Sequence, residues 1–133
     1  MKRRTVLAAA ALAAFTLAGG MPAMAQTIDV NAILHDPDAP EAGNPEGDVT
    51  IVAFLDYNCP FCKTSAPDLD RIVEEDGNIR LVYKDWPVLS EASVYGAQLA
   101  LAAKFQGKYE EVHHALMGVP GHKVTEAQML EAV

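Results

Sequence analysis

The chain has 133 residues, of which 18 are acidic and 10 are basic, so its formal net charge is −8. The first 25 residues contain three of the basic residues and no acidic residue, which leaves a charge of −11 on the remaining 108. This acidity argues against nucleic-acid and anionic-membrane partners, and the length fits one small domain.

Residues 1–25 have the pattern of a secretory signal peptide. Basic residues at positions 2–4 precede an uncharged apolar run, 6–20, and the small residues Ala23 and Ala25 follow it. We expect cleavage after Ala25 and export to the periplasm. The run of 15 residues is shorter than the roughly 20 residues of a membrane-spanning helix, so no stable membrane insertion is expected. The adjacent arginines leave both the Sec and the twin-arginine export routes open.

Residues 26–48 are predicted to be an N-terminal extension and loop. A weakly amphipathic piece, 28–34, is followed by a stretch rich in Pro, Gly, Asp and Asn. Residues 49–57 then form an almost continuous apolar run with many β-branched and aromatic side chains. Such a run is typical of a strand that is buried on both faces. We therefore expect a central strand at 49–57.

A helix and a second strand are predicted next. Residues 61–76 place apolar side chains at helical spacing and stop before Gly77, and Pro67 inside them predicts a bent helix. Residues 79–86 have the alternation of a strand. Together these elements predict a βαβ unit over 49–87, with parallel strands and a right-handed crossover. The apolar residues of the helix are Phe61, Ala66, Leu69, Ile72 and Val73.

The remaining residues, 88–133, are predicted to be helical. The segments 91–106 and 108–117 carry apolar side chains on one side at helical spacing. Thr125 followed by Gln128 is a capping-box signature, which predicts a third helix at the end of the chain.

The two cysteines of the chain lie at the expected junction between the first strand and the first helix. Cys59 starts the helix, where unpaired backbone N–H groups and the helix dipole favour a thiolate, so its pKa should fall from about 8.5 into the range of about 3.5–7.5. Cys62 lies one turn further along the same face. A disulfide across so short a loop contributes little stability, so we expect a redox role in which Cys59 attacks and Cys62 resolves.

The two residues between the cysteines are expected to tune the redox chemistry. Pro60 suits the first turn of a helix, where its missing N–H is no loss. Phe61 would offer a bulky apolar lip to an unfolded substrate. Reduction potentials within this chemistry differ widely, from about −270 to about −120 mV, so the motif leaves oxidation, isomerisation and reduction all open.

A zinc site is the main alternative for the cysteine pair. The histidines do not form a second ligand pair of the zinc-finger type, and the proline between the cysteines suits a redox loop better, so no metal is expected. For the adjacent His113 and His114 we expect one surface residue and one partly buried residue. The histidines of the chain are His35, His113, His114 and His122.

The run from Val49 to Lys63, which contains Cys59-Pro60-Phe61-Cys62, together with Pro67, resembles the thioredoxin superfamily. Within it, the segments 43–45 and 82–89 look like the DsbA-type branch. The similarity covers about residue 36 to the C-terminus. It implies an α/β thioredoxin-like fold with a helical insertion at 88–133 and thiol-disulfide exchange with unfolded or reduced exported proteins. No cofactor is expected, because the cysteines carry the electrons themselves, and a redox-recycling partner, either a membrane protein or a soluble one, must restore the cysteine pair.

One departure from this family pattern lies at Ala53, six residues before Cys59, where many DsbA-type strands carry a glutamate. That glutamate can relay protons beneath the cysteines. Its absence puts proton transfer from Cys62 in doubt unless water or another carboxylate, such as Asp56, replaces it. We expect Asp56 to be a loop-end or solvent-facing residue.

A second departure lies at the C-terminus. The resemblance implies a strand hairpin and a last helix after the insertion, with a cis-proline loop that faces the cysteines, and neither Pro87 nor Pro120 stands in that context. We therefore expect a truncated domain over 49–133, with an unpaired apolar edge on the first strand. The alternative function is a redox-inactive remnant or binding module with an inert Cys59–Cys62 disulfide.

Overall fold

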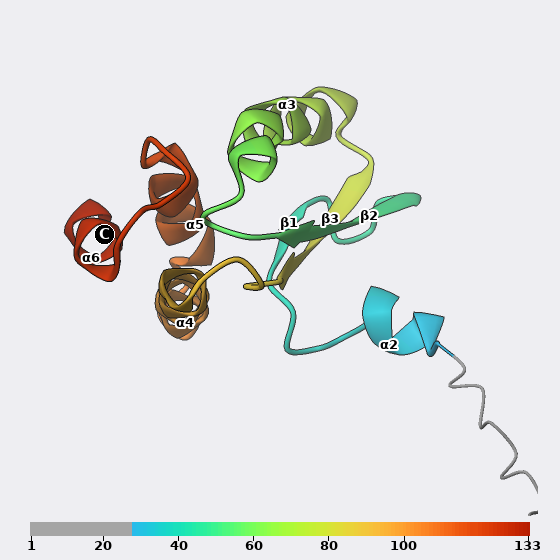
Figure 1. Cartoon of the computed structure of the whole chain (residues 1–133). Coiled ribbons are helices and arrows are strands. Elements are labelled where there is room, and N and C mark those ends of the chain that lie inside the picture. Colours follow the sequence, from blue (N-terminus) through green and yellow to red (C-terminus); the bar gives the residue numbers. More distant parts are fainter. Residues whose placement is uncertain (1–27) are drawn as a thin grey trace, which may run out of the picture.

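A computed structural model describes residues 28–133, and the predicted signal peptide lies outside these residues. A three-stranded sheet lies at the centre, with α3 against one face and the other long helices at one end (Figure 1). None of the helices in this part of the chain is long and apolar enough to cross a membrane. The elements are α2 Val30–Leu34, β1 Glu41–Gly43, β2 Val49–Leu55, α3 Pro60–Asp76, β3 Ile79–Asp85, α4 Glu91–Lys104, α5 Tyr109–Gly118 and α6 Glu126–Ala132.

The sheet confirms the parallel pairing of the two predicted strands. β2 and β3 pair in parallel from Val49 opposite Ile79 to Leu55 opposite Asp85. The prediction of a central position for β2 is wrong, because the strand order is β1-β3-β2 and β3 lies in the middle. β2 is an edge strand among the described residues, and Phe54 on its outer face is 49% exposed. The apolar run therefore reflects one buried face and one half-exposed face.

The strand β1 corrects the prediction of a loop after residue 34. Residues 41–43 pair antiparallel with β3, and Gly43 lies opposite Arg80. A strand of three residues is too short to show the alternation by which strands are recognised. Its partner also lies about 40 positions away, so the pairing is visible only in the folded chain.

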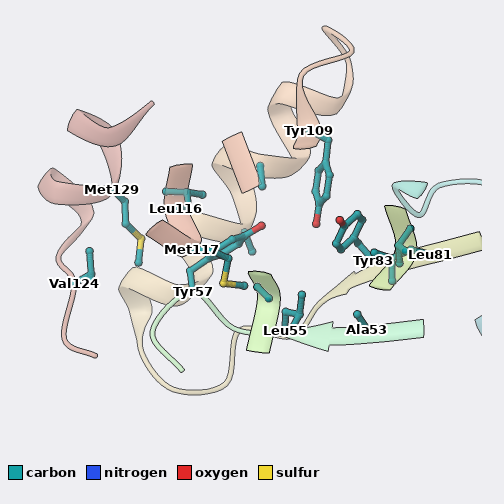
Figure 2. Close-up of a cluster of buried hydrophobic side chains, with 14 of the residues drawn as sticks. Ala53, Leu55, Tyr57, Leu81, Tyr83, Tyr109, Leu116, Met117, Val124 and Met129 are labelled. Carbon is teal, nitrogen blue, oxygen red and sulfur yellow. The ribbon is translucent and has the colours of Figure 1, made fainter. Parts of the chain in front are cut away.

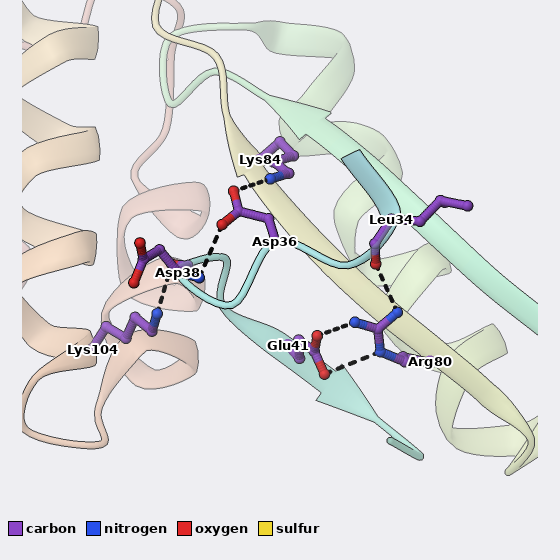
Figure 3. Close-up of polar contacts among 7 residues, drawn as sticks. All are labelled: Leu34, Asp36, Asp38, Glu41, Arg80, Lys84 and Lys104. Carbon is purple, nitrogen blue, oxygen red and sulfur yellow. Dashed lines mark hydrogen bonds and ion pairs between the residues drawn. The ribbon is translucent and has the colours of Figure 1, made fainter. Parts of the chain in front are cut away.

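Charged side chains hold the N-terminal segment, residues 34–41, against β3 (Figure 3). The Arg80 guanidinium donates to both carboxylate oxygens of Glu41 and to the carbonyl of Leu34. Lys84 pairs with Asp36 nearby. These contacts bring residues 34–41 against the central strand, where Pro40 is buried.

The helix α3 continues through Pro67 without a break, as expected. Ala66 and Val73 on its inner face are buried. The prediction that Phe61 and Ile72 also belong to that face is wrong, because Phe61 is 83% exposed and Ile72 is also exposed. Phe61 lies in the first turn of α3 and lines a hollow together with Phe54 and Leu55 of β2.

The three predicted C-terminal helices are confirmed as α4, α5 and α6. Thr125 and Gln128 form the expected reciprocal capping box at the start of α6. Gly96 lets α4 approach the rest of the core closely, because a Cβ there would lie 2.9 Å from the Met129 sulfur and 3.1 Å from the Tyr57 ring. Aromatic rings and apolar side chains from the sheet and all three helices fill this end of the core (Figure 2).

A buried polar chain joins α5 to the sheet. His113 is 1% exposed, and its Nδ1 lies 3.0 Å from the Tyr57 hydroxyl. Burial, together with the neighbouring His114, lowers the pKa of His113 to about 4, so the ring is neutral at pH 7. Burial also raises the pKa of Asp85 to about 6, although hydrogen bonds from the hydroxyls of Tyr57 and Tyr109 act to lower it. In the unfolded chain water hydrogen-bonds to these polar groups, whereas in the folded chain their hydrogen-bond partners come from within this cluster.

We predict that Gly43→Ala destabilises the fold more than Gly77→Ala. Both glycines have a φ of 72°, and a side chain in this left-handed region costs about 1 kcal/mol. At Gly43 the new Cβ would also lie 2.5 Å from the Ile79 carbonyl oxygen and 2.6 Å from the Val73 side chain, whereas at Gly77 it would meet nothing within 4 Å. Denaturant unfolding should show a loss above about 2 kcal/mol for Gly43→Ala. Equal losses would contradict the packing of β1.

Candidate redox site

Cys59 is the N-cap residue of α3. Its backbone is extended, with φ −79° and ψ 115°, and Pro60 begins the helix. The Cys59 sulfur accepts a hydrogen bond from the backbone N–H of Cys62 at 3.3 Å. Both cysteines are free thiols and half-buried. The structure thus brings the two predicted residues together at the junction between β2 and the helix.

The pKa values of the two thiols shift in opposite directions. Burial raises the pKa of Cys59, but hydrogen bonds from the Cys62 thiol and from the backbone N–H groups of Cys62 and Phe61 outweigh it, so the net pKa is lowered. Burial, the Cys59 sulfur and the charge of Asp56 together raise the pKa of Cys62. A thiolate therefore forms first at Cys59, while Cys62 holds its proton.

Asp56 is a loop-end residue, and the prediction that it faces solvent is wrong. Its carboxyl group is buried, with 4% of the residue exposed. One oxygen accepts from the backbone N–H of Asn58 at 2.7 Å, and the other accepts from Val88 and Leu89 at 2.9 and 3.0 Å. Three N–H donors hold the carboxylate in place, so it fixes the turn before Cys59 against the segment after β3.

Asn58 is a site residue that sequence reasoning missed, and it is 3% exposed beside Cys59. Its side-chain carbonyl accepts from the Val124 N–H at 2.7 Å, and its amide donates to the Val124 carbonyl at 3.2 Å and to the Ser90 hydroxyl at 2.9 Å. Asn58 therefore joins the cysteine turn to two segments of the helical insertion. Its partners are 32 and 66 positions away, so no local pattern could reveal them.

Apolar side chains surround the second cysteine on the outer side. A hollow of about 490 Å³ is lined there by the Cys62 side chain together with Phe54, Leu55, Phe61, Thr64, Ser65 and Asp68. The Phe54 ring meets Trp86 edge to face, with centroids 5.7 Å apart. Phe61 thus lies in the exposed position expected of an apolar lip.

The adjacent residues His113 and His114 both lie on α5. His113 is buried in the core, and His114 is exposed and lies 3.2 Å from the Asp70 carboxylate. This arrangement matches the expected split between a buried and a surface histidine. Within residues 28–133, no three side chains of His, Cys, Asp or Glu come together as a metal site would require.

The fold and the cysteine pair place the chain in a known family. A family model described as Thioredoxin matches residues 36–132, and the chain belongs to this family. The fold is α/β and thioredoxin-like with a helical insertion. Within the superfamily the chain is of the DsbA type, as the solved structures below indicate.

Three solved structures are similar to the chain. A thioredoxin-like oxidoreductase from Silicibacter pomeroyi DSS-3 is 48% identical, with a TM-score of 0.74, and the match covers 79% of this chain and 60% of that one. A periplasmic thioredoxin-like protein from Salmonella enterica serovar Typhimurium is 30% identical, with a TM-score of 0.73 and coverage of 80% and 63%. The thiol-disulfide exchange protein alpha-DsbA2 from Wolbachia pipientis is 33% identical, with a TM-score of 0.70 and coverage of 77% and 55%.

The curated relatives are much longer proteins. The Na(+)/H(+) antiporter NhaA 1 of Salinispora arenicola is 33% identical over 90 residues, which are 65% of this chain and 14% of the antiporter. The chain therefore spans about one seventh of the length of that relative, and less than two thirds of the similar solved chains.

We predict that the two thiols titrate on opposite sides of the ordinary thiol pKa of about 8.5. The rate of alkylation by iodoacetamide, followed against pH and mapped by mass spectrometry, should rise at lower pH for Cys59 than for Cys62. In Cys62→Ala, the pKa of Cys59 should rise relative to the intact pair, because the neighbouring thiol donor is lost. In Cys59→Ala, Cys62 should stay above the ordinary value because its burial remains. Two equal, ordinary midpoints would contradict the described site.

We predict that Asp56→Asn weakens the fold and makes Cys59 more acidic. The amide NH₂ replaces one acceptor oxygen and faces backbone donors, so the unfolding free energy should fall by about 2 kcal/mol. Loss of the negative charge removes a contribution that raises the pKa of Cys59. Denaturant unfolding and the alkylation profile measure the two effects. The control is Asp68→Asn, at an exposed residue of α3, which should leave the unfolding free energy almost unchanged. An equally small change for Asp56→Asn would rule out the role of Asp56 in holding the turn.

Proposed function

We propose that the chain is an exported thiol-disulfide oxidoreductase that exchanges disulfides with cysteines of periplasmic or secreted proteins. The observation that carries the proposal is the position of the cysteine pair at the start of α3, where the Cys59 sulfur accepts a hydrogen bond from the Cys62 backbone N–H at 3.3 Å. The opposite shifts of the two thiol pKa values agree with this geometry. An acidic, accessible thiol next to a less acidic one is the arrangement that thiol-disulfide exchange requires. Similarity to oxidoreductases with this chemistry supports it.

Cys59 is the nucleophile and Cys62 the resolving residue in this proposal. In the reducing direction, the Cys59 thiolate attacks one sulfur of a substrate disulfide, forms a mixed disulfide and releases the other substrate sulfur as a thiolate. Cys62 then loses its proton and attacks Cys59, which frees the second substrate thiol and leaves a Cys59–Cys62 disulfide. Two electrons pass from the protein to the substrate, and the oxidising direction is the same sequence reversed.

The acidity of Cys59 bears on the direction of exchange. A thiolate stabilised by hydrogen bonds is a good leaving group, so a mixed disulfide at Cys59 is readily attacked by a second substrate thiol. Stabilising the reduced form also makes the disulfide form a stronger oxidant. Pro60 and Phe61 are the residues we expect to adjust this balance, Pro60 by starting the helix and Phe61 by contacting the substrate.

The proposal includes a compartment and a recycling partner. Residues 1–25 would direct export, and a similar protein from Salmonella enterica is periplasmic. The cysteines carry the electrons themselves, so the exchange needs no cofactor. Each catalytic cycle changes the oxidation state of the pair, and a redox partner, either in the membrane or soluble, must therefore restore it.

We predict that Cys62→Ala traps disulfide-linked complexes with exported proteins, whereas Cys59→Ala traps none. Without Cys62 the mixed disulfide at Cys59 cannot be resolved from within the protein. Non-reducing electrophoresis of periplasmic extracts, with mass spectrometry of the captured species, measures the difference. A reducing lane is the control, since true complexes dissociate there. Equal trapping by the two variants would reject the assigned roles, and a folded wild-type chain silent in peptide oxidation and insulin reduction would reject the function.

A further inference from the structure

The loop between α5 and α6 is fastened beside Cys59 at both of its ends. Lys63 Nζ, from the first turns of α3, donates to the carbonyls of Val119 and Gly121 at 2.5 and 3.0 Å. Asn58 exchanges two hydrogen bonds with the backbone of Val124. The loop is therefore held next to the cysteine pair by the residues that immediately precede Cys59 and follow Cys62.

A hollow lies beside the turn that carries Cys59. It has a volume of about 550 Å³, and its lining residues are Asn58, Pro60, Leu89, Ser90, His122 and Lys123. Asn58 and Pro60 are the two sequence neighbours of Cys59, so the hollow adjoins the backbone of the nucleophilic residue. Two of the polar lining residues, Asn58 and Ser90, hydrogen-bond to each other.

The charge of this hollow is opposite to that of the chain as a whole. The chain carries 18 acidic and 10 basic residues, yet the lining contains Lys123 and His122 and no acidic residue. The hollow lined by Cys62 and Phe61 contains Asp68 and no basic residue. A peptide at the cysteine pair can therefore meet the basic side chain of Lys123 in one hollow and the carboxylate of Asp68 in the other.

We propose that the hollow is a subsite for an acidic side chain close to the cysteine of the substrate protein. An extended peptide advances about 3.3 Å per residue, so an Asp or Glu within a few positions of the substrate cysteine reaches the hollow while the sulfur meets Cys59. Pro60 and Leu89 contact its aliphatic part, and Lys123 and His122 face the carboxylate. This inference rests on the proposed function, because it specifies which substrates the same cysteine pair prefers.

The test uses two peptides that differ in one side chain. Each has a single cysteine joined by a disulfide to a coloured thiol, and a Glu in one peptide replaces a Gln near the cysteine in the other. The second-order rate of colour release by the reduced chain should be higher for the Glu peptide. In Lys123→Gln the ratio of the two rates should fall about threefold, as expected for one exposed charge pair. Added salt should reduce the wild-type ratio in the same way.

Two further variants make the result decisive. Lys123→Glu should reverse the preference. Lys108→Gln, which removes the charge of an exposed lysine outside the hollow, should leave the ratio unchanged. A ratio that is the same in wild type and Lys123→Gln, while both peptides react, would overturn the subsite and leave the proposed function standing. Failure of both peptides to react would instead overturn the proposed function.

Discussion

The turn between Leu55 and Pro60 is the feature on which the rest of the site depends. In four residues the chain leaves β2, reverses and begins α3, and the Cys59 N–H donates to the Asp56 carbonyl at 3.0 Å within this turn. The Asp56 carboxylate and the Asn58 amide, both buried, bind the turn to segments that follow β3 and α5. The sulfur of Cys59 thus occupies a fixed position at the start of the helix.

Buried polar groups also connect the helical insertion to the sheet. His113 on α5 meets Tyr57, which lies two residues before Cys59, and Tyr109 meets Asp85 at the end of β3. Tyr57 is therefore both part of the core and adjacent to the redox turn. The insertion consequently does more than cover the sheet, because it supports the strand end from which the cysteine turn starts.

Local signals in the sequence were enough to predict most of the framework. The junction of an apolar strand and a helix located both cysteines, and Thr125 with Gln128 located the last helix. Features that depend on residues far away in the sequence were either missed or predicted wrongly. Asp56 looked like a solvent-facing loop residue until its donors, Val88 and Leu89, were seen, and β1 is recognisable only through its pairing with β3. The composition of β2 indicated a central strand, whereas the family resemblance indicated an unpaired edge, and the strand order agrees with the resemblance.

The two thiols differ in pKa because they share the charge of Asp56 but differ in hydrogen bonding and burial. Asp56 lies near both cysteines, and its charge raises the pKa of each. Cys59 receives compensating hydrogen bonds at the helix start, from the Cys62 thiol and from two backbone N–H groups, whereas Cys62 is more deeply buried and donates to the sulfur it would later attack. Three backbone N–H groups donate to the Asp56 carboxylate and hold it in place. The carboxylate therefore acts on the cysteines through its charge and through the turn it braces.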